Sequence, residues 1–280
     1  MHYGWPKDLD PFGPKFVGRF AKYCKVVARK LKSYSDTAPF YQPFNKISFL
    51  SWAMTHNGLI HPFNPSFNHR SFELKRQFVL AALRGSEAIW SVDPRERIIH
   101  TDPIIHITSP SNASNEQLED TKRHNDYAFQ AWDMLCGDME PGLGGSRKHL
   151  DIIGLNYYHE NQWEHGSNDR LHWHLKDPRR LPFNALAAKA WRRYQRPMFI
   201  AETSHLGESR GDWLDEMADE IVKCEARGVP IDGVCLYPII DRPDWENPSH
   251  WHKSGMWDVE NTVKIRWKIR WKIQCKIWMN

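Results

Sequence analysis

The sequence lacks the features that mark several protein classes. It has no apolar run near the ~20 residues that a helix needs to cross a bilayer, and its start, MHYGWPKDLD, has no cationic segment followed by an apolar one. It also has no G-x-G-x-x-G or G-K-[ST] motif of the kind that binds nucleotides. We therefore expect no transmembrane segment, no secretory leader and no nucleotide cofactor.

Cysteine and net charge are also scarce. The five cysteines are odd in number and form no C-x-x-C pair, which argues against a disulfide framework or a zinc knuckle and favours a reducing, cytoplasmic location. The formal charge is +4, but residues 264–280 hold six basic residues and no acid, so the remainder carries −2. Nucleic acid is therefore not an expected partner.

Short apolar runs alternate with longer amphipathic stretches along the 280 residues, of which 41% are apolar and 26% charged. That alternation is typical of βα units around a parallel sheet. The length is ample for one large domain with a buried core. We predict strands at residues 40–45, 98–107, 150–157, 197–202 and 231–240, and helices at residues 16–32, 72–88 and 212–226.

Each predicted strand of this group ends in polar or aromatic residues: Asn45, Asn156 with Tyr158, Glu202, and the segment 237–241. In a parallel barrel the carboxyl ends of the strands and the loops after them form the active site, so these positions are candidate site residues. The polar segments 108–124 and 159–185 are too long for simple connectors. We predict that they are loops over this face.

The last 17 residues have a different pattern. Basic or polar residues alternate with Ile and Trp from position 264 to 277, which is the period of a β-strand. We therefore divide the chain into a domain at 1–263 and a cationic tail at 264–280. The tail suits an edge strand, an arm that binds a membrane surface or a partner, or a non-native extension, and these alternatives stay open.

Glu202 ends the apolar strand in P-M-F-I-A-E-T-S. A carboxylate there is costly to desolvate, so it is usually kept for a partner or a reaction, although a structural ion pair is the alternative. Asp241, Asp244 and Trp245 follow the last predicted strand. Carboxylates beside an indole suit a sugar, because they accept from hydroxyls while the ring packs on its C–H face; ordinary loop acids are the alternative.

Six segments, in order, resemble motifs of the family 1 glycoside hydrolases, which are retaining (β/α)8 enzymes of the β-glucosidase type. They are H-Y-G-W-P, P-F-N-K-I-S-F, D-I-I-G-L-N-Y-Y, I-A-E-T, Y-P-I-I-D-R-P-D-W and S-G-M-W-D. The resemblance implies that Glu202 is the nucleophile. It also implies that the sugar is bound by the remaining candidates, which are His2, Asn45, Asn156, Tyr158, Tyr237, Asp244 and Trp245.

The sequence departs from this family at two places. Lys46 occupies the position of the acid/base glutamate, and a lysine is a poor proton donor and, when charged, no base. We expect Lys46 to form an ion pair with Glu202. In addition, the first matching motif lies at the start of the chain, so the resemblance predicts an incomplete (β/α)8 TIM barrel without strands 1, 2 and most of 3. Open barrel edges suggest self-association or a partner chain.

These observations lead to competing functions. The first is a retaining β-glycosidase-like protein that acts on a β-linked glycoside with impaired hydrolysis, and the second is a catalytically silent sugar-binding or scaffold protein. A third, a metal-dependent hydrolase, is suggested by the H-W-H triplets at 172–174 and 250–252, but these lie in polar loops. The preferred interpretation needs no cofactor and no metal, because the chemistry uses two carboxyls and water.

Overall fold

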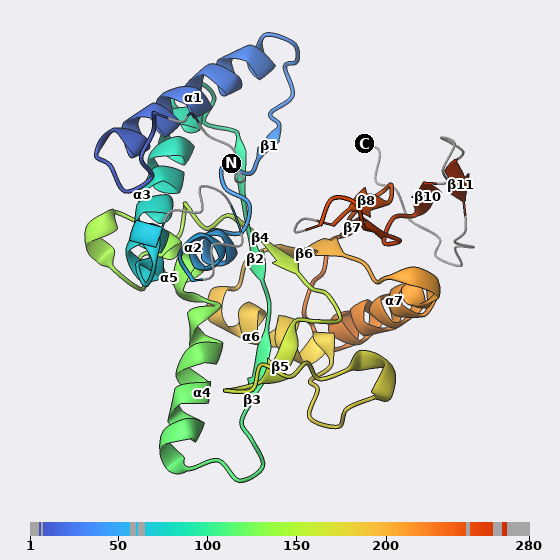
Figure 1. Ribbon diagram of the computed structural model, residues 1–280. Helices are drawn as coiled ribbons and strands as arrows, with labels where there is room; N and C mark the ends of the chain where they lie inside the picture. Colours follow the sequence, from blue (N-terminus) through green and yellow to red (C-terminus); the bar gives the residue numbers. More distant parts are fainter. Residues whose placement is uncertain are drawn as a thin grey trace.

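The chain is built on a curled sheet of five parallel strands, in the order β1-β2-β4-β6-β7 (Figure 1). The computed structural model describes residues 6, 8–56, 60, 65–244, 247–259 and 265–267. The strands are β1 (Phe40–Tyr41), β2 (Arg97–Pro103), β4 (Ile152–Asn156), β6 (Met198–Thr203) and β7 (Val234–Leu236). The described sheet is therefore an open part of a barrel, as the sequence predicts.

One helix precedes the first strand of this sheet, and further helices connect its successive strands (Figure 1). They are α1 (Lys15–Lys32), α2 (Ile47–Thr55), α3 (Ser71–Trp90), α5 (Gln130–Cys136), α6 (Phe183–Tyr194) and α7 (Arg210–Ala226), and short 3₁₀ turns lie at η1 (Pro65–Phe67), η2 (Pro141–Leu143), η3 (Trp173–Leu175) and η4 (Gly207–Ser209). The predicted helices at 16–32, 72–88 and 212–226 are confirmed as α1, α3 and α7, with small differences at their ends.

The contact between α1 and α3 shows how the helices bury their apolar faces. Phe16, Phe20, Cys24 and Ala28 recur every fourth residue of α1 and are all buried. Gly85 of α3 allows the close approach, because a Cβ there would lie 3.1 Å from both Cys24 Sγ and Phe20 Cε1. The apolar stripe of α1 therefore packs against α3 at a point where α3 has no side chain.

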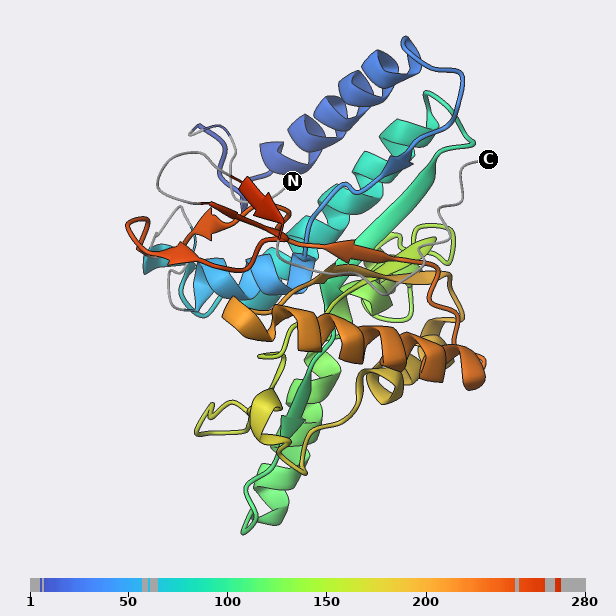
Figure 2. The same cartoon turned by 90° about the vertical axis from the view of Figure 1, so that its right-hand side faces the viewer.

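A second structural unit extends from the sheet, where β3 (His106–Thr108) pairs in parallel with β5 (Gln162–Glu164) beside α4 (Asn115–Tyr127) (Figure 2). The prediction that residues 108–124 form a loop is wrong, because most of them belong to α4. This helix begins with a capping box between Ser114 and Gln117 and buries only Thr121. Without an apolar stripe, its sequence has no helical periodicity. Segment 159–185 is largely irregular, apart from β5, η3 and the start of α6.

Most predicted strands are longer than the observed ones. Residues 40–45 contain the two-residue β1, after which Asn45 forms a single bridge to Thr101, and residues 98–107 are divided between β2 and β3. The last strand shortens from 231–240 to Val234–Leu236. The order and the parallel direction are nevertheless as predicted. No helix in the described residues is long and apolar enough to cross a membrane.

The C-terminal part of the described chain forms two small antiparallel sheets. β8 (Arg242–Pro243) pairs with β9 (Trp251–His252), and β10 (Trp257–Val259) pairs with β11 (Ile265–Trp267). Three residues of the tail form β11, and the alternatives for the tail stay open. Residues 264 and 268–280 lie outside the described residues, and the boundary at 263 stays a prediction.

Asp102 links β2 to the start of α2. Its carboxylate, 1% exposed, accepts the main-chain N–H of Ser48 at 2.9 and 3.1 Å and that of Phe49 at 3.3 Å. The N-terminal N–H groups of a helix have no partner within the helix, so Asp102 caps α2 from a neighbouring strand. Burial is the main cause that raises the pKa of Asp102 to about 6, and the N–H donors oppose this shift.

We expect the substitution Asp102→Asn to remove a pH-dependent part of the stability. The folded chain holds this proton more tightly than the unfolded chain, since the ordinary pKa is 3.8. The wild-type free energy of unfolding should therefore fall by up to about 3 kcal/mol, relative to the variant, as pH rises from about 4 to about 6. Urea unfolding across this range measures the difference. Asp219→Asn on the surface is the control, and parallel profiles for wild type and Asp102→Asn would contradict the assignment.

Candidate active site

Glu202, near the carboxyl end of β6, is at the centre of the candidate site. Its side chain is 14% exposed. Tyr158 Oη donates to Glu202 Oε2 at 2.8 Å, and Asn45 Nδ2 donates to Oε1 at 3.4 Å. Burial, and then the charge of Glu202, raise the pKa of Tyr158, so the phenol remains protonated and can donate. The structure thus brings together three of the predicted site residues.

Lys46 is the third partner of this carboxylate. Its Nζ lies 2.5 Å from Glu202 Oε2, and its side chain is 13% exposed, so the predicted ion pair is present and shielded from solvent. Lys46 precedes α2 with φ of 63°, in the left-handed region, where its N–H donates to Thr101 O at 3.1 Å. A non-glycine residue in this left-handed conformation costs roughly 1–2 kcal/mol. Such a conformation persists only where the surrounding contacts enforce it, which is frequent at functional sites.

Gln42 and Thr101, which the sequence analysis did not single out, orient Asn45. Gln42 Nε2 and Thr101 Oγ1 each donate to Asn45 Oδ1 at 3.0 Å. Because Gln42 and Thr101 both bind the side-chain oxygen of Asn45, the NH₂ group of Asn45 points to Glu202. Thr101 belongs to the predicted strand at 98–107, but its neighbours in space come from elsewhere in the chain. No pattern in the sequence joins these three residues.

Asn156 is also buried at this end of the sheet. It is 1% exposed and is the register partner of Glu202 on the adjacent strand. Neither its Nδ2 nor its Oδ1 has a hydrogen-bond partner among the described residues. An amide buried in this way costs about 1–3 kcal/mol unless a ligand or a water satisfies it. A polar ligand bound beside Glu202 would therefore find a ready partner.

The remaining predicted sugar contacts belong to the C-terminal segments or lie outside the described residues. Tyr237 follows β7, its N–H donates to Thr203 O at 3.2 Å, and its phenol is close enough to Tyr158 to contribute to the raised pKa of that residue. Asp244 accepts the N–H of Asn247 at 2.9 Å and pairs with His252, so its carboxylate is engaged within the β8–β9 hairpin. The structure thus does not bring Asp244 into contact with Glu202. His2 and Trp245 lie outside the described residues.

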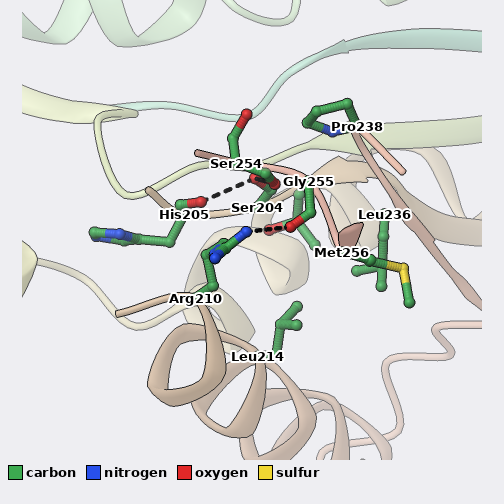
Figure 3. Close-up of a pocket in the computed structure, with 10 residues that line it drawn as sticks. Ser204, His205, Arg210, Leu214, Leu236, Pro238, Ser254, Gly255 and Met256 are labelled. Carbon is green, nitrogen blue, oxygen red and sulfur yellow. Dashed lines mark hydrogen bonds between the residues drawn. The ribbon is translucent and has the colours of Figure 1, made fainter. Parts of the chain in front are cut away.

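A small pocket lies next to the end of β6, just beyond Glu202, and Figure 3 shows the residues around it. Its lining comes from the end of β6, the start of α7, the end of β7 and the segment 254–256. Arg210 donates to Gly255 O there, and Ser204 Oγ donates to Ser254 O at 3.0 Å. No residue that contacts the Glu202 carboxylate lines this pocket. Its hydrogen bonds attach the C-terminal segment to the sheet.

Comparison with solved structures identifies the fold. An enzyme from Alicyclobacillus herbarius matches 95% of this chain and 69% of its own, with a TM-score of 0.75 and 12% identity. A hyperthermophilic β-glucosidase from Pyrococcus furiosus matches 92% of this chain and 57% of its own, with a TM-score of 0.71 and 16% identity. A family 1 β-glucosidase from Thermotoga maritima, in complex with isofagomine lactam, matches 92% and 67%, with a TM-score of 0.69 and 14% identity.

The chain has the fold of part of a (β/α)8 barrel, as in these glycosidase structures. It spans 57–69% of the length of these three structures, which agrees with the incomplete (β/α)8 barrel predicted from the sequence. At 12–16% identity the similarity concerns the fold. No family model matches the sequence, and no curated protein matches it.

Within this incomplete (β/α)8 barrel, the described residues around Glu202 offer one carboxylate and one ammonium. A retaining glycosidase uses two carboxyl groups about 5–5.5 Å apart, one as nucleophile and one as acid and base. Here the Glu202 carboxylate accepts from Asn45 and Tyr158 and forms an ion pair with Lys46. The ammonium of Lys46 thus lies where a second carboxyl group would be needed for that chemistry.

The two H-W-H triplets do not form a metal centre in the described part of the chain. The rings of His172 and His174 lie 5.4 Å apart and those of His250 and His252 lie 5.3 Å apart. His252 pairs with Asp244, and neither triplet belongs to a group of three metal-binding side chains among the described residues. The third functional alternative has no support from this geometry.

Proposed function

We propose that this chain is a retaining β-glycosidase-like protein that acts on β-linked glycosides with impaired hydrolysis. The observation that carries the proposal is the Glu202 carboxylate, which accepts from Asn45 and Tyr158 at the carboxyl edge of a parallel sheet. The unsatisfied amide of Asn156 on the neighbouring strand adds a polar group for a sugar. The glycosidase-like fold supports the same chemistry by analogy.

Lys46 determines which step is impaired. In the first step Glu202 attacks the anomeric carbon, the bond to the leaving oxygen breaks, and that oxygen needs a proton unless it departs as a stable anion. An alkylammonium is a weak acid, so it transfers this proton poorly at neutral pH. In the second step water must lose a proton, and charged Lys46 has no lone pair to accept it. We therefore expect activated aryl glycosides to form an ester that hydrolyses slowly.

Incubation with a 2-deoxy-2-fluoro aryl β-glycoside tests the nucleophile directly. Such a compound needs little acid assistance, so we expect one glycosyl group to be attached to each chain and the modified peptide to contain Glu202. Intact-mass and peptide mass spectrometry measure this. Glu202→Gln should abolish the labelling, and Glu225→Gln on the surface of α7 should not change it. Labelling that persists in Glu202→Gln would exclude the assigned role.

A catalytically silent sugar-binding or scaffold protein is the second candidate. It is favoured by the position of Lys46, because the ammonium lies against the same oxygen, Oε2, to which Tyr158 donates. Absence of any adduct, together with sugar binding measured by calorimetry, would support this function over the first. In both cases a carbohydrate is the expected ligand.

Two further expectations remain predictions. β1 and β7 are the outer strands of the described sheet, so self-association or a partner chain would use the backbone along their edges. Light scattering during size-exclusion chromatography measures this association. The expected cytoplasmic location can be measured by imaging of the tagged protein in cells.

A further inference from the structure

Three side chains on the unit formed by β3, α4 and β5 gather at one point. Asp120 and His124 are one turn apart on α4, and His165 directly follows β5. One potential ligand atom from each lies within 4.8 Å of the others. Asp120 Oδ2 is 2.7 Å from His165 Nε2, and Asp120 Oδ1 is 3.6 Å from His124 Nδ1. None of the three contacts the Glu202 carboxylate.

We propose that Asp120, His124 and His165 form a zinc site. Two imidazoles and one carboxylate are a donor set that zinc accepts, whereas magnesium and calcium prefer oxygen ligands alone. Zinc bonds of about 2.0–2.2 Å in a tetrahedron place the donor atoms about 3.3 Å apart, and the potential ligand atoms here already lie within 4.8 Å of one another. The side chains are 20–39% exposed, so solvent can supply the fourth ligand.

The elements that carry the ligands are already fixed to one another. Asn125, which follows His124, accepts the N–H of Ile107 at 2.9 Å and donates to Ile107 O at 2.8 Å, so it attaches α4 to β3. The N–H of His165 donates to Thr108 O at 2.8 Å. The three ligands are therefore held near their binding positions before zinc arrives. We infer that zinc binding requires only small side-chain movements.

One ring nitrogen of His124 has a main-chain partner. Its Nδ1 lies 2.9 Å from the main-chain oxygen of Asp120. The same nitrogen lies 3.6 Å from Asp120 Oδ1, so zinc bound at Nδ1 would replace this hydrogen bond and leave the ring proton on Nε2.

Arg123 competes with a metal for the same carboxylate. Its Nη2 lies 2.6 Å from Asp120 Oδ1, and its side chain is 62% exposed. An ion pair at such an exposed position contributes little, so zinc can displace the guanidinium. The direction in which loss of Arg123 changes the zinc affinity is therefore predictable. Arg123→Ala should strengthen zinc binding about 2- to 5-fold, because Asp120 is then free of its competitor.

Calorimetric titration of the metal-free chain with zinc, without a polyhistidine tag, tests the proposal. We expect one zinc per chain. Loss of a residue that only hydrogen-bonds to a metal ligand weakens metal binding by about 10–100-fold. His124→Ala and His165→Ala remove a ligand itself, so each should weaken zinc binding by more than this. His174→Ala, an exposed histidine of the H-W-H triplet, is the matched control and should leave the affinity unchanged. Circular dichroism shows whether each variant remains folded.

Cobalt provides an independent spectroscopic readout. We expect visible absorption bands of tetrahedral cobalt that are lost in His165→Ala. The proposal is overturned if zinc does not bind stoichiometrically, if both histidine variants bind like wild type, or if Arg123→Ala weakens binding. A strong thiolate-to-cobalt band in the near ultraviolet would place the metal on a cysteine, such as the exposed Cys235, and would also overturn it.

Discussion

Replacing Lys46 with glutamate should raise the hydrolysis of aryl β-glycosides by a factor of about 10² or more, the usual scale of acid and base assistance. The variant would place a carboxyl group where the ammonium now contacts Glu202. One carboxyl can then act as nucleophile while the other protonates the leaving oxygen and activates water. Initial rates with a series of aryl leaving groups measure the effect, which should be largest for the least acidic phenol.

Lys46→Gln is the matched control for this experiment. It removes the charge next to Glu202 but supplies no proton donor of useful acidity, so hydrolysis should stay well below that of Lys46→Glu. The glutamate variant should also acquire a bell-shaped pH profile, because two neighbouring carboxyls titrate as a pair with separated apparent pKa values. Equal rates for wild type and Lys46→Glu would count against Lys46 as the acid/base position.

Replacing Arg210 with methionine should lower the free energy of unfolding by about 3–5 kcal/mol, the usual cost of removing one partner from a buried ion pair. Arg210 Nη2 lies 2.9 Å from Asp258 Oδ1, and Nη1 lies 3.7 Å from Asp241 Oδ1. All three side chains are at most 8% exposed. The substitution would bury both carboxylates without the guanidinium that balances their charge.

Urea unfolding followed by circular dichroism measures this loss. Arg227→Met is the matched control, because Arg227 is exposed at the end of α7 and should change the stability by no more than about 0.5 kcal/mol. The double variant Arg210→Met with Asp258→Leu should recover part of the loss, since an apolar pair of similar size needs no charge compensation. A loss no larger than that of Arg227→Met would show that the ion pairs do not hold the C-terminal segment.

The local hydrophobic pattern was sufficient to predict the helices and strands with the clearest apolar pattern. The strand ending at Glu202 is apolar over consecutive residues, and α1 buries a residue at every fourth position, so both are readable from the sequence. Other helices lack this signal. α5 is buried at six of its seven positions and α4 at only one of thirteen, so neither shows one polar and one apolar face.

In the candidate site too, the sequence predicts some features, and others depend on the tertiary structure. The sequence by itself determined that a carboxylate lies near the end of a buried strand, that Asn45 and Lys46 come shortly after another strand, and that the strands alternate with helices. Each of these follows from residues that are neighbours along the chain.

Only the tertiary structure decided that Lys46 reaches Glu202, that Gln42 and Thr101 orient Asn45, and that His165 meets Asp120. These contacts join residues on different strands and helices, and they depend on strand register and on the packing of whole elements. Hydrophobic periodicity shows which face of an element is buried, but it contains no information on which polar side chains meet once those elements are packed.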